Sequence, residues 1–217
     1  MATEEPSSLR LAGTLAVAGL LSGLILVGVF IVTEPIIQQN HADALQRAIY
    51  KVLPGTKKIE AFKLSGDKIV PYEGKPGAPT KETLVYKGLD DSGASVGWAV
   101  PASGSGFQDT IALIYGFDPK KKAIIGMEIL DSRETPGLGD KIGYDEHFRA
   151  NFKALEVEPN IELVKRGEKT APNQVDAITG ATISSRAVVG ILQSSTKEWV
   201  PRLGDEPAKT AAAGKGR

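Results

Sequence analysis

The longest apolar stretch of the chain predicts a helix that crosses a membrane. Residues 11–32 form an uncharged run rich in Leu, Val, Ile, Ala and Gly. As an α-helix, this run is about 33 Å long, which matches the hydrocarbon thickness of a bilayer. A signal peptide is the alternative, but its apolar region is shorter, and residues 31–35 lack a small-x-small cleavage site. We therefore expect an uncleaved anchor, preceded by a short terminus of residues 1–10.

The pattern after the anchor predicts a second helix over residues 36–53, ended by Pro54-Gly55. Its apolar face is formed by Ala42, Leu45, Ile49 and Val52, at three- and four-residue spacing. A partner protein could cover this face. We expect it instead to pack on the folded domain, because a sheet needs helices to cover it.

Alternating apolar residues predict strands in the middle of the chain. Two short candidates, residues 59–64 and 83–86, are separated by a Gly/Pro loop at 74–79. Three longer candidates have apolar residues at every second position: Val96, Trp98 and Val100; Ile111, Leu113, Tyr115 and Phe117; Ile125, Met127 and Ile129. Period two predicts that each strand shows one face to the core and the other to solvent or a ligand. Residues 118–122 should form a hairpin loop, and 101–107 a glycine loop without Rossmann or Walker spacing.

The C-terminal part of the chain predicts two further helices and a strand. A short helix is expected over residues 144–152, a strand over 161–164, and an amphipathic helix from about 184 to 199. The tail 204–217 contains nothing large and apolar to bury, so we expect it to be disordered. These elements predict an α+β fold, with residues 36–203 as one domain. A twisted antiparallel sheet carries packed helices and is tethered by one N-terminal transmembrane helix.

Composition excludes several kinds of site. Lys+Arg and Asp+Glu are equal at 26 each, and no basic stripe alternates with aromatic residues, so nucleic-acid binding finds no support. Cysteine is absent, which excludes disulfides, thiolate metal sites and iron–sulfur clusters held by this chain. His41 and His147 have no companion at ligand spacing, so we expect solvated surface residues and no metal site.

Residues 176–185 carry a motif at the start of the last predicted helix. A helix start presents unpaired backbone N–H groups and the positive end of the macrodipole, which together favour a phosphate. Gly180 and Ala181 would let a phosphate approach the backbone, and Thr182, Ser184 and Ser185 offer hydroxyls beside it. From spacing alone, an ordinary helix start capped by Ser or Thr is the commoner interpretation.

The pattern D-x-x-T-G-A-T-x-S-S formed by these residues resembles the signature of the FMN-binding domain family. In that family, a flavin transferase joins FMN to the last threonine through a phosphoester bond. The resemblance implies that Thr182 is the attachment residue. It also implies cofactor-binding or transferase-recognition roles for the rest of the motif: Asp176, Thr179, Gly180, Ala181, Ser184 and Ser185.

A second segment, E-T-P-G-L-G-D-K-I at residues 134–142, resembles a segment of the same family. It follows the last long strand and should be a loop, because Gly137 and Gly139 permit conformations closed to other residues. Such a loop can lay backbone amides against a planar ring. On this resemblance, the candidates for the flavin environment are Glu134, Thr135, Gly137, Leu138 and Gly139.

The resemblance implies electron carriage by a covalently bound FMN in a membrane complex, with no catalytic residue of the chain's own. It is closest to the G subunit of Rnf-type ion-translocating ferredoxin:NAD oxidoreductases, and implies other complex subunits and a flavin transferase as partners. The C subunit of the sodium-pumping NADH:quinone oxidoreductase is an alternative. Another is a flavin-free assembly or binding module, which the intact Thr182 motif disfavours. Flanking charges do not decide orientation. The resemblance implies an inner-membrane anchor with residues 1–10 cytoplasmic and 36–203 extracytoplasmic.

Overall fold

The computed structural model describes residues 7–66, 68–74, 77, 80 and 82–204. The chain divides between Ala42 and Asp43 into two units, which are described separately. The predicted tail, apart from Gly204, and much of the predicted Gly/Pro loop at 74–79 lie outside the described residues.

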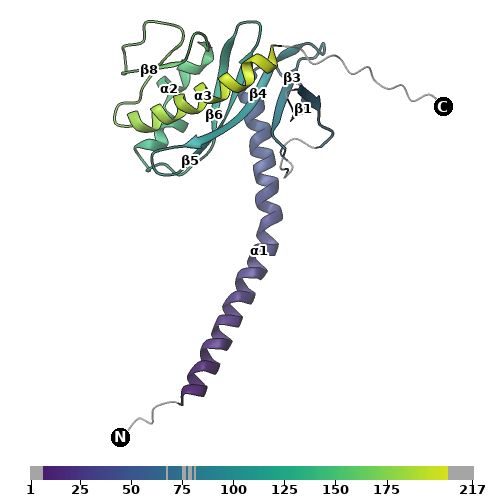
Figure 1. Cartoon of the computed structure of the whole chain (residues 1–217), viewed down its shortest axis with the longest axis vertical. Helices are drawn as coiled ribbons and strands as arrows, with labels where there is room; N and C mark the ends of the chain where they lie inside the picture. The colour runs from purple at the N-terminus through teal and green to yellow at the C-terminus, as the bar shows by residue number, and fades with distance from the viewer. Residues whose placement is uncertain (1–6, 67, 75–76, 78–79, 81, 205–217) are drawn as a thin grey trace, which may run out of the picture. The chain divides into compact units, whose positions relative to one another are not determined.

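The two predicted N-terminal helices are a single element, α1, which runs from Ser8 to Val52 (Figure 1). The expectation of a break between them was wrong. Pro35 lies inside α1 and removes one backbone donor, but the helical backbone continues on both sides of it. The side chains of Glu34 and Gln38 bridge this turn with a hydrogen bond of 2.7 Å. In its apolar part, α1 is long enough to cross a membrane, as predicted for an anchor.

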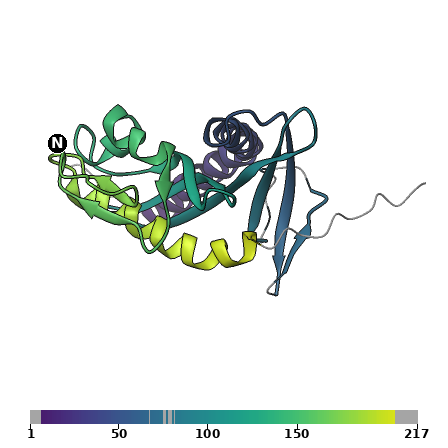
Figure 2. The ribbon, with the colours of Figure 1, turned by 90° about the horizontal axis from the view of Figure 1, so that it is seen from above.

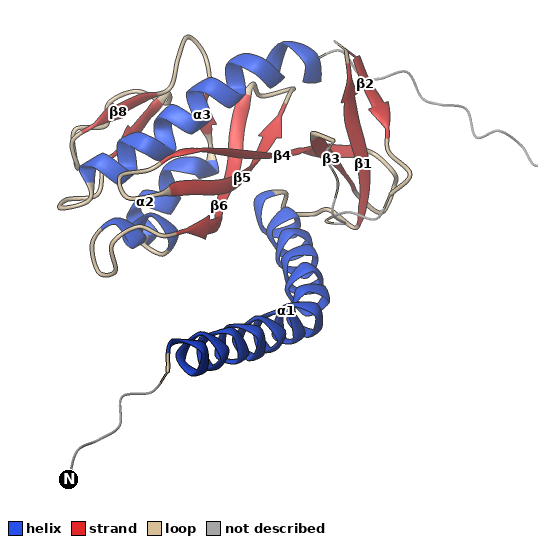
Figure 3. Cartoon of the chain, turned by 60° about the horizontal axis from the view of Figure 1, so that its bottom comes forward, coloured by secondary structure: helices blue, strands red, loops and turns tan. Residues whose placement is uncertain are grey.

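The strands predicted in the middle of the chain are confirmed and belong to one antiparallel sheet (Figure 3). Its strands are β1 (Lys58–Ser65), β2 (Lys68–Pro71), β3 (Leu84–Leu89), β4 (Ser95–Ser105), β5 (Thr110–Asp118), β6 (Ala123–Ser132) and β7 (Leu155–Glu156). Within the described residues, their order across the sheet is β2-β1-β3-β4-β5-β6-β7. The hairpin loop predicted at 118–122 joins β5 to β6.

The predicted glycine loop at 101–107 is largely strand. β4 continues through Ser105 and pairs with β5, with Gly104 opposite Ile111. Gly104 also lies against the last helix, where a Cβ would come within 2.7 Å of Ile191. The small residues that suggested a loop therefore belong to a strand, where they allow a helix to pack closely.

Helices cover both faces of the sheet (Figure 2). One face packs against α3 (Thr182–Leu203), and Tyr115 reaches across to Ser195 with a hydrogen bond of 2.9 Å. The other face packs against residues 48–53 at the end of α1 and the turn after it. The predicted packing of this helix face on the domain is confirmed.

The prediction of a solvent- or ligand-facing side for each strand was wrong for β5. Ile114 is fully buried on the second face, opposite to Leu113 and Tyr115. At the next inward position, a Cβ on Gly116 would lie 2.1 Å from the carbonyl oxygen of Val52. The second face therefore buries small residues that let a helix backbone approach the sheet, and these leave little apolar signal in the sequence.

The remaining elements lie between β6 and α3 in chain order, with β7 among them. They are η1 (Gly139–Gly143), α2 (Glu146–Ala150), η2 (Asn151–Lys153), β8 (Glu162–Val164) and β9 (Gln174–Asp176). The predicted helix at 144–152 is split between α2 and η2, and its two phenylalanines, Phe148 and Phe152, pack edge to face at 5.1 Å. The strand predicted at 161–164 is β8, which pairs with β9 in parallel, so the fold is mostly rather than wholly antiparallel.

Candidate functional site

The threonine motif links β9 to α3. Asp176 ends β9, Ala177 and Ile178 are buried, and the chain then turns at Thr179-Gly180 into the helix. Gly180 has φ +83°, a conformation that side-chain-bearing residues rarely adopt, so this turn favours glycine. α3 begins at Thr182. The residue in the capping position is Ala181, and no side chain caps the helix. The interpretation of a helix start capped by Ser or Thr was therefore wrong.

The two serines of the motif point into the protein. Ser185 accepts a hydrogen bond from the amide of Ile178 at 3.1 Å and donates one to the carbonyl of Ala181 at 2.9 Å. Ser184 donates its hydroxyl hydrogen to the carboxylate of Glu134. Both serines are buried, which explains the missing cap: their hydroxyls fasten the preceding turn and a neighbouring loop instead.

The two threonines are different. Thr179 and Thr182 are exposed, and neither hydroxyl forms a hydrogen bond with any residue that the structure describes. The geometry therefore leaves Thr182 accessible to modification, whereas the hydroxyls of Ser184 and Ser185 already form hydrogen bonds.

Glu134 joins the second motif to the first. Only 5% of this residue is exposed, and its carboxylate also accepts the backbone amides of Phe107 at 2.8 Å and Gln108 at 3.0 Å. Burial alone would raise the pKa of Glu134, but the hydrogen bonds from Ser184 and these amides outweigh it and hold the pKa below its ordinary value. Glu134 is thus an ionised side chain. It lies in the loop after β6, and its hydrogen bonds connect this loop to the β4–β5 turn and to the start of α3.

The loop at 134–139 packs tightly onto the helix start. A Cβ on Gly139 would lie 2.7 Å from the Ser184 hydroxyl oxygen and 2.8 Å from the Glu134 carboxylate, so only glycine fits there. Gly137 lies in the exposed turn before it, with φ +74°. The structure therefore brings together the two motifs that the sequence separates by about forty residues.

Between these motifs lies a small pocket of about 130 Å³. It is lined by Phe107, Glu134, Thr135, Leu138, Gly139, Gly180, Ala181, Thr182, Ile183 and Ser184. Three apolar side chains remain exposed around it: Phe107 by 63%, Leu138 by 51% and Ile183 by 53%. Leu138 was predicted to belong to the flavin environment. Phe107 and Ile183 were not assigned a role, although a large apolar residue beside a glycine turn is a signal that could have found Phe107.

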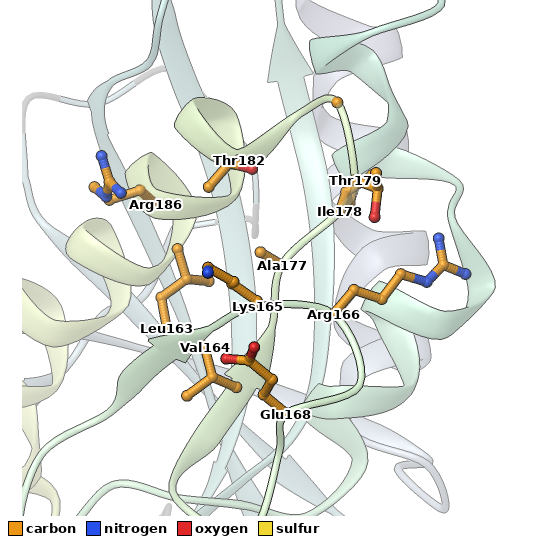
Figure 4. Close-up of a pocket in the computed structure, with 11 residues that line it drawn as sticks. Leu163, Val164, Lys165, Arg166, Glu168, Ala177, Ile178, Thr179, Thr182 and Arg186 are labelled. Atoms are coloured by element: carbon orange, nitrogen blue, oxygen red, sulfur yellow. The ribbon is translucent and has the colours of Figure 1, made fainter.

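A second pocket, of about 480 Å³, opens on the other side of the threonine motif (Figure 4). Thr179, Gly180 and Thr182 line it together with residues from β8, the loop after β8, the two residues that follow β9 and the first turns of α3. Its charged lining residues are Lys165, Arg166, Glu168 and Arg186. None of these was singled out from the sequence. Thr182 and Gly180 line both pockets, so the motif forms the boundary between them.

Asp176 holds one of the loops that line this second pocket. Its buried carboxylate accepts the amides of Gly167 at 3.1 Å and Lys169 at 3.2 Å, and so fixes the loop that carries the charged residues. His147 Nε2 lies 3.0 Å from the same carboxylate. His147 is exposed as predicted, but it is paired with Asp176 rather than simply solvated.

Comparisons with known proteins agree with the two motifs. The FMN-binding domain family matches residues 106–197. The G subunit of the ion-translocating oxidoreductase complex of Methanosarcina acetivorans is 34% identical over 182 residues, which cover 84% of this chain and 89% of that protein. The G subunit of the proton-translocating ferredoxin:NAD(+) oxidoreductase complex of Clostridium ljungdahlii is 26% identical, over 85% of this chain and 88% of that protein.

The fold is also found among solved structures. The crystal structure of Shewanella oneidensis NqrC superposes with a TM-score of 0.64 at 21% identity, over 76% of this chain and 98% of that one. At this identity the likeness concerns the fold alone. The sequence relatives decide the family: the chain belongs to the FMN-binding G subunits of ion-translocating oxidoreductase complexes.

Proposed function

We propose that this chain carries FMN as a phosphoester on Thr182 and relays electrons in an Rnf-type, ion-translocating ferredoxin:NAD oxidoreductase complex. The observation that carries the proposal is the hydroxyl of the exposed residue Thr182, which is unengaged by any described residue and lies at the boundary of two pockets. The relatives named as subunits of such complexes support the assignment to a complex.

The residues present fit an FMN group. The hydroxyl of Thr182 is accessible for the ester, and the apolar side chains of Phe107, Leu138 and Ile183 offer contact surface for a planar ring beside it. The pocket between them is shallow, so the ring would keep one side open to a neighbouring carrier. Glu134 and Ser184 hold the loop and the helix start that form this surface.

When bound, FMN supplies reversible uptake of one or two electrons. The chain's own residues bind and orient it, and none is assigned as acid, base or nucleophile in turnover. We place residues 1–10 in the cytoplasm, residues 11–32 of α1 in the inner membrane and the domain from residue 36 to 203 on the extracytoplasmic side. A separate flavin transferase would form the ester, since no described side chain hydrogen-bonds to Thr182 and could activate its hydroxyl.

A C subunit of a sodium-pumping NADH:quinone oxidoreductase is the second candidate, favoured by the shared fold with NqrC. The G-subunit relatives match at higher identity over most of their length, which favours the Rnf-type assignment. Fractionation of the native complex separates the two. Co-purification with a cysteine-rich ferredoxin-like subunit is expected for the Rnf type.

The covalent bond is tested by mass spectrometry of the full chain co-expressed with a flavin transferase. A peptide containing Ala181-Thr182-Ile183 should carry the mass of FMN less one water. Thr182→Ala should lose the flavin, and Ser194→Ala, which removes an exposed hydroxyl of α3 outside the motif, should keep it. Flavin that washes out of the wild-type protein in denaturant would contradict the covalent proposal. A folded, permanently flavin-free protein would favour an assembly module.

A further inference from the structure

The larger pocket beside Thr182 gathers positive charge that neither motif accounts for. Lys165 and Arg166 come from the loop after β8, and Arg186 lies one turn into α3 (Figure 4). Glu168 contributes one negative charge to the same lining. The start of α3 adds the positive end of a helix dipole at Thr182.

Two of these cations are not neutralised by an ion pair with the described part of the chain. Among the residues that the structure describes, neither Lys165 nor Arg186 has an ion-pair partner. Arg166, in contrast, lies 4.0 Å from the carboxylate of Asp145. Like charges around one pocket repel each other, and an anion placed between them relieves that repulsion. The pocket is therefore suited to a negatively charged group.

The smaller pocket has the opposite character. Its charged lining residue is Glu134, which is held ionised by its hydrogen bonds, and its exposed rim is apolar. A phosphate would be repelled on that side of Thr182 and attracted on the other. An uncharged planar ring should instead prefer the smaller pocket, where it can contact the apolar rim.

We propose that Lys165 and Arg186 form an anion subsite for the phosphodiester of the flavin carried on Thr182. This inference rests on the proposed function and adds a direction to it: the phosphate lies toward the cationic pocket and the ring toward Phe107, Leu138 and Ile183. Lys165 and Arg186 are positioning residues. They fix the linkage, and the Asp176 carboxylate holds the loop that carries Lys165 in place.

A thermodynamic cycle tests the subsite. The full chain in detergent is prepared with and without flavin, as wild type and as Lys165→Gln/Arg186→Gln, and Tm is measured by intrinsic tryptophan fluorescence. Flavin attachment should raise Tm in the wild type, and the double variant should lose roughly 2–4 °C of that rise if the coupling is about 1 kcal/mol. Without flavin, the double variant should melt at or slightly above the wild-type temperature, because it lacks the repulsion.

Three controls sharpen the result. Lys153→Gln/Lys197→Gln removes two exposed cations that do not line the pocket, and should leave the rise unchanged. Glu168→Gln removes the opposing anion from the pocket and should enlarge the rise. Sodium chloride at high concentration should reduce it in the wild type by screening. The single variants Lys165→Gln and Arg186→Gln are measured too. If the double variant does not receive flavin, each single variant still provides a thermodynamic cycle of its own.

An equal Tm rise in wild type, the double variant and both single variants would overturn the subsite. That outcome leaves the proposed function intact, since mass spectrometry would still find FMN on Thr182. Absence of flavin from wild-type Thr182 after co-expression would instead contradict the proposed function itself.

Discussion

The hydroxyl of Ser184 donates a hydrogen bond to the buried carboxylate of Glu134, 50 residues earlier in the chain. The same carboxylate accepts the amides of Phe107 and Gln108. Three segments around Thr182 therefore depend on one ionised side chain, and the shape of the candidate site should respond to its protonation.

Glu134→Gln should destabilise the protein by about 1–3 kcal/mol at neutral pH, because a neutral amide cannot replace an anionic acceptor of several hydrogen bonds. The pKa of Glu134 is lower in the folded than in the unfolded chain, so the unfolded chain binds more protons as the pH falls. The Glu134 contribution is complete above the ordinary carboxyl pKa of about 4.3 and is lost as the pH falls through the lowered value. The measurement is urea unfolding over a pH series. The difference in the free energy of unfolding between wild type and Glu134→Gln should become smaller in acid. Glu156→Gln, which changes an exposed carboxyl group, should unfold with the same free energy as the wild type.

Leu138→Ala should leave folding almost unchanged, because 51% of Leu138 is exposed and surface substitutions usually cost less than about 0.5 kcal/mol. If the ring lies against this loop, the flavin should remain attached but become more fluorescent or shift its reduction potential. Tyr144→Ala is the control. Tyr144 is close to Leu138 in the chain and is 56% exposed, but it does not line the pocket. Unchanged absorbance, fluorescence and potential in Leu138→Ala would remove this loop from the flavin contacts.

Gly116→Ala should strongly destabilise the domain, by about 3 kcal/mol or more, because the new methyl group meets the Val52 backbone. Gly190→Ala is the matched contrast. It lies inside α3 with nothing within 4 Å of the new Cβ, so it should stabilise by about 0.5–1 kcal/mol through helix propensity. Thermal melts of both variants check the close packing of α1 on the sheet. Similar melting temperatures would show that this packing is wrong.

Membrane orientation can be tested with single cysteines, since the chain has none. Lys121→Cys, in the β5–β6 hairpin loop, should react with a membrane-impermeant thiol reagent in intact spheroplasts. Ser7→Cys should react only after lysis. The reverse pattern would place the domain in the cytoplasm.

Much of the fold was predictable because apolar alternation marks the face of the sheet that packs on α3. The other face was not, because its inward positions include Ala99 and Gly116. Such residues bury little apolar area but admit a helix backbone, and periodicity counts them as polar or neutral. The continuity of α1 was not predictable either, because a proline in a helix interior usually kinks or breaks the helix, yet α1 continues through Pro35.

For the candidate site, the sequence supplied both motifs but not the reason for their residues. Asp176 and Ser185 form hydrogen bonds with backbone amides, and the motif alone does not reveal this structural role. Lys165 and Arg186 come from segments that meet only in the folded chain. Their joint placement required the β8–β9 pairing, which is too short to predict from periodicity.

The position of Thr182 on a boundary between two pockets has a consequence for affinity. A flavin tethered there would be presented to its pocket at an effective concentration of about millimolar, as for a short flexible linker. A pocket with a dissociation constant of about the same size would then be occupied half of the time. The proposed covalent bond would thus replace tight recognition, and the ring could leave its pocket to meet a partner without ever leaving the protein.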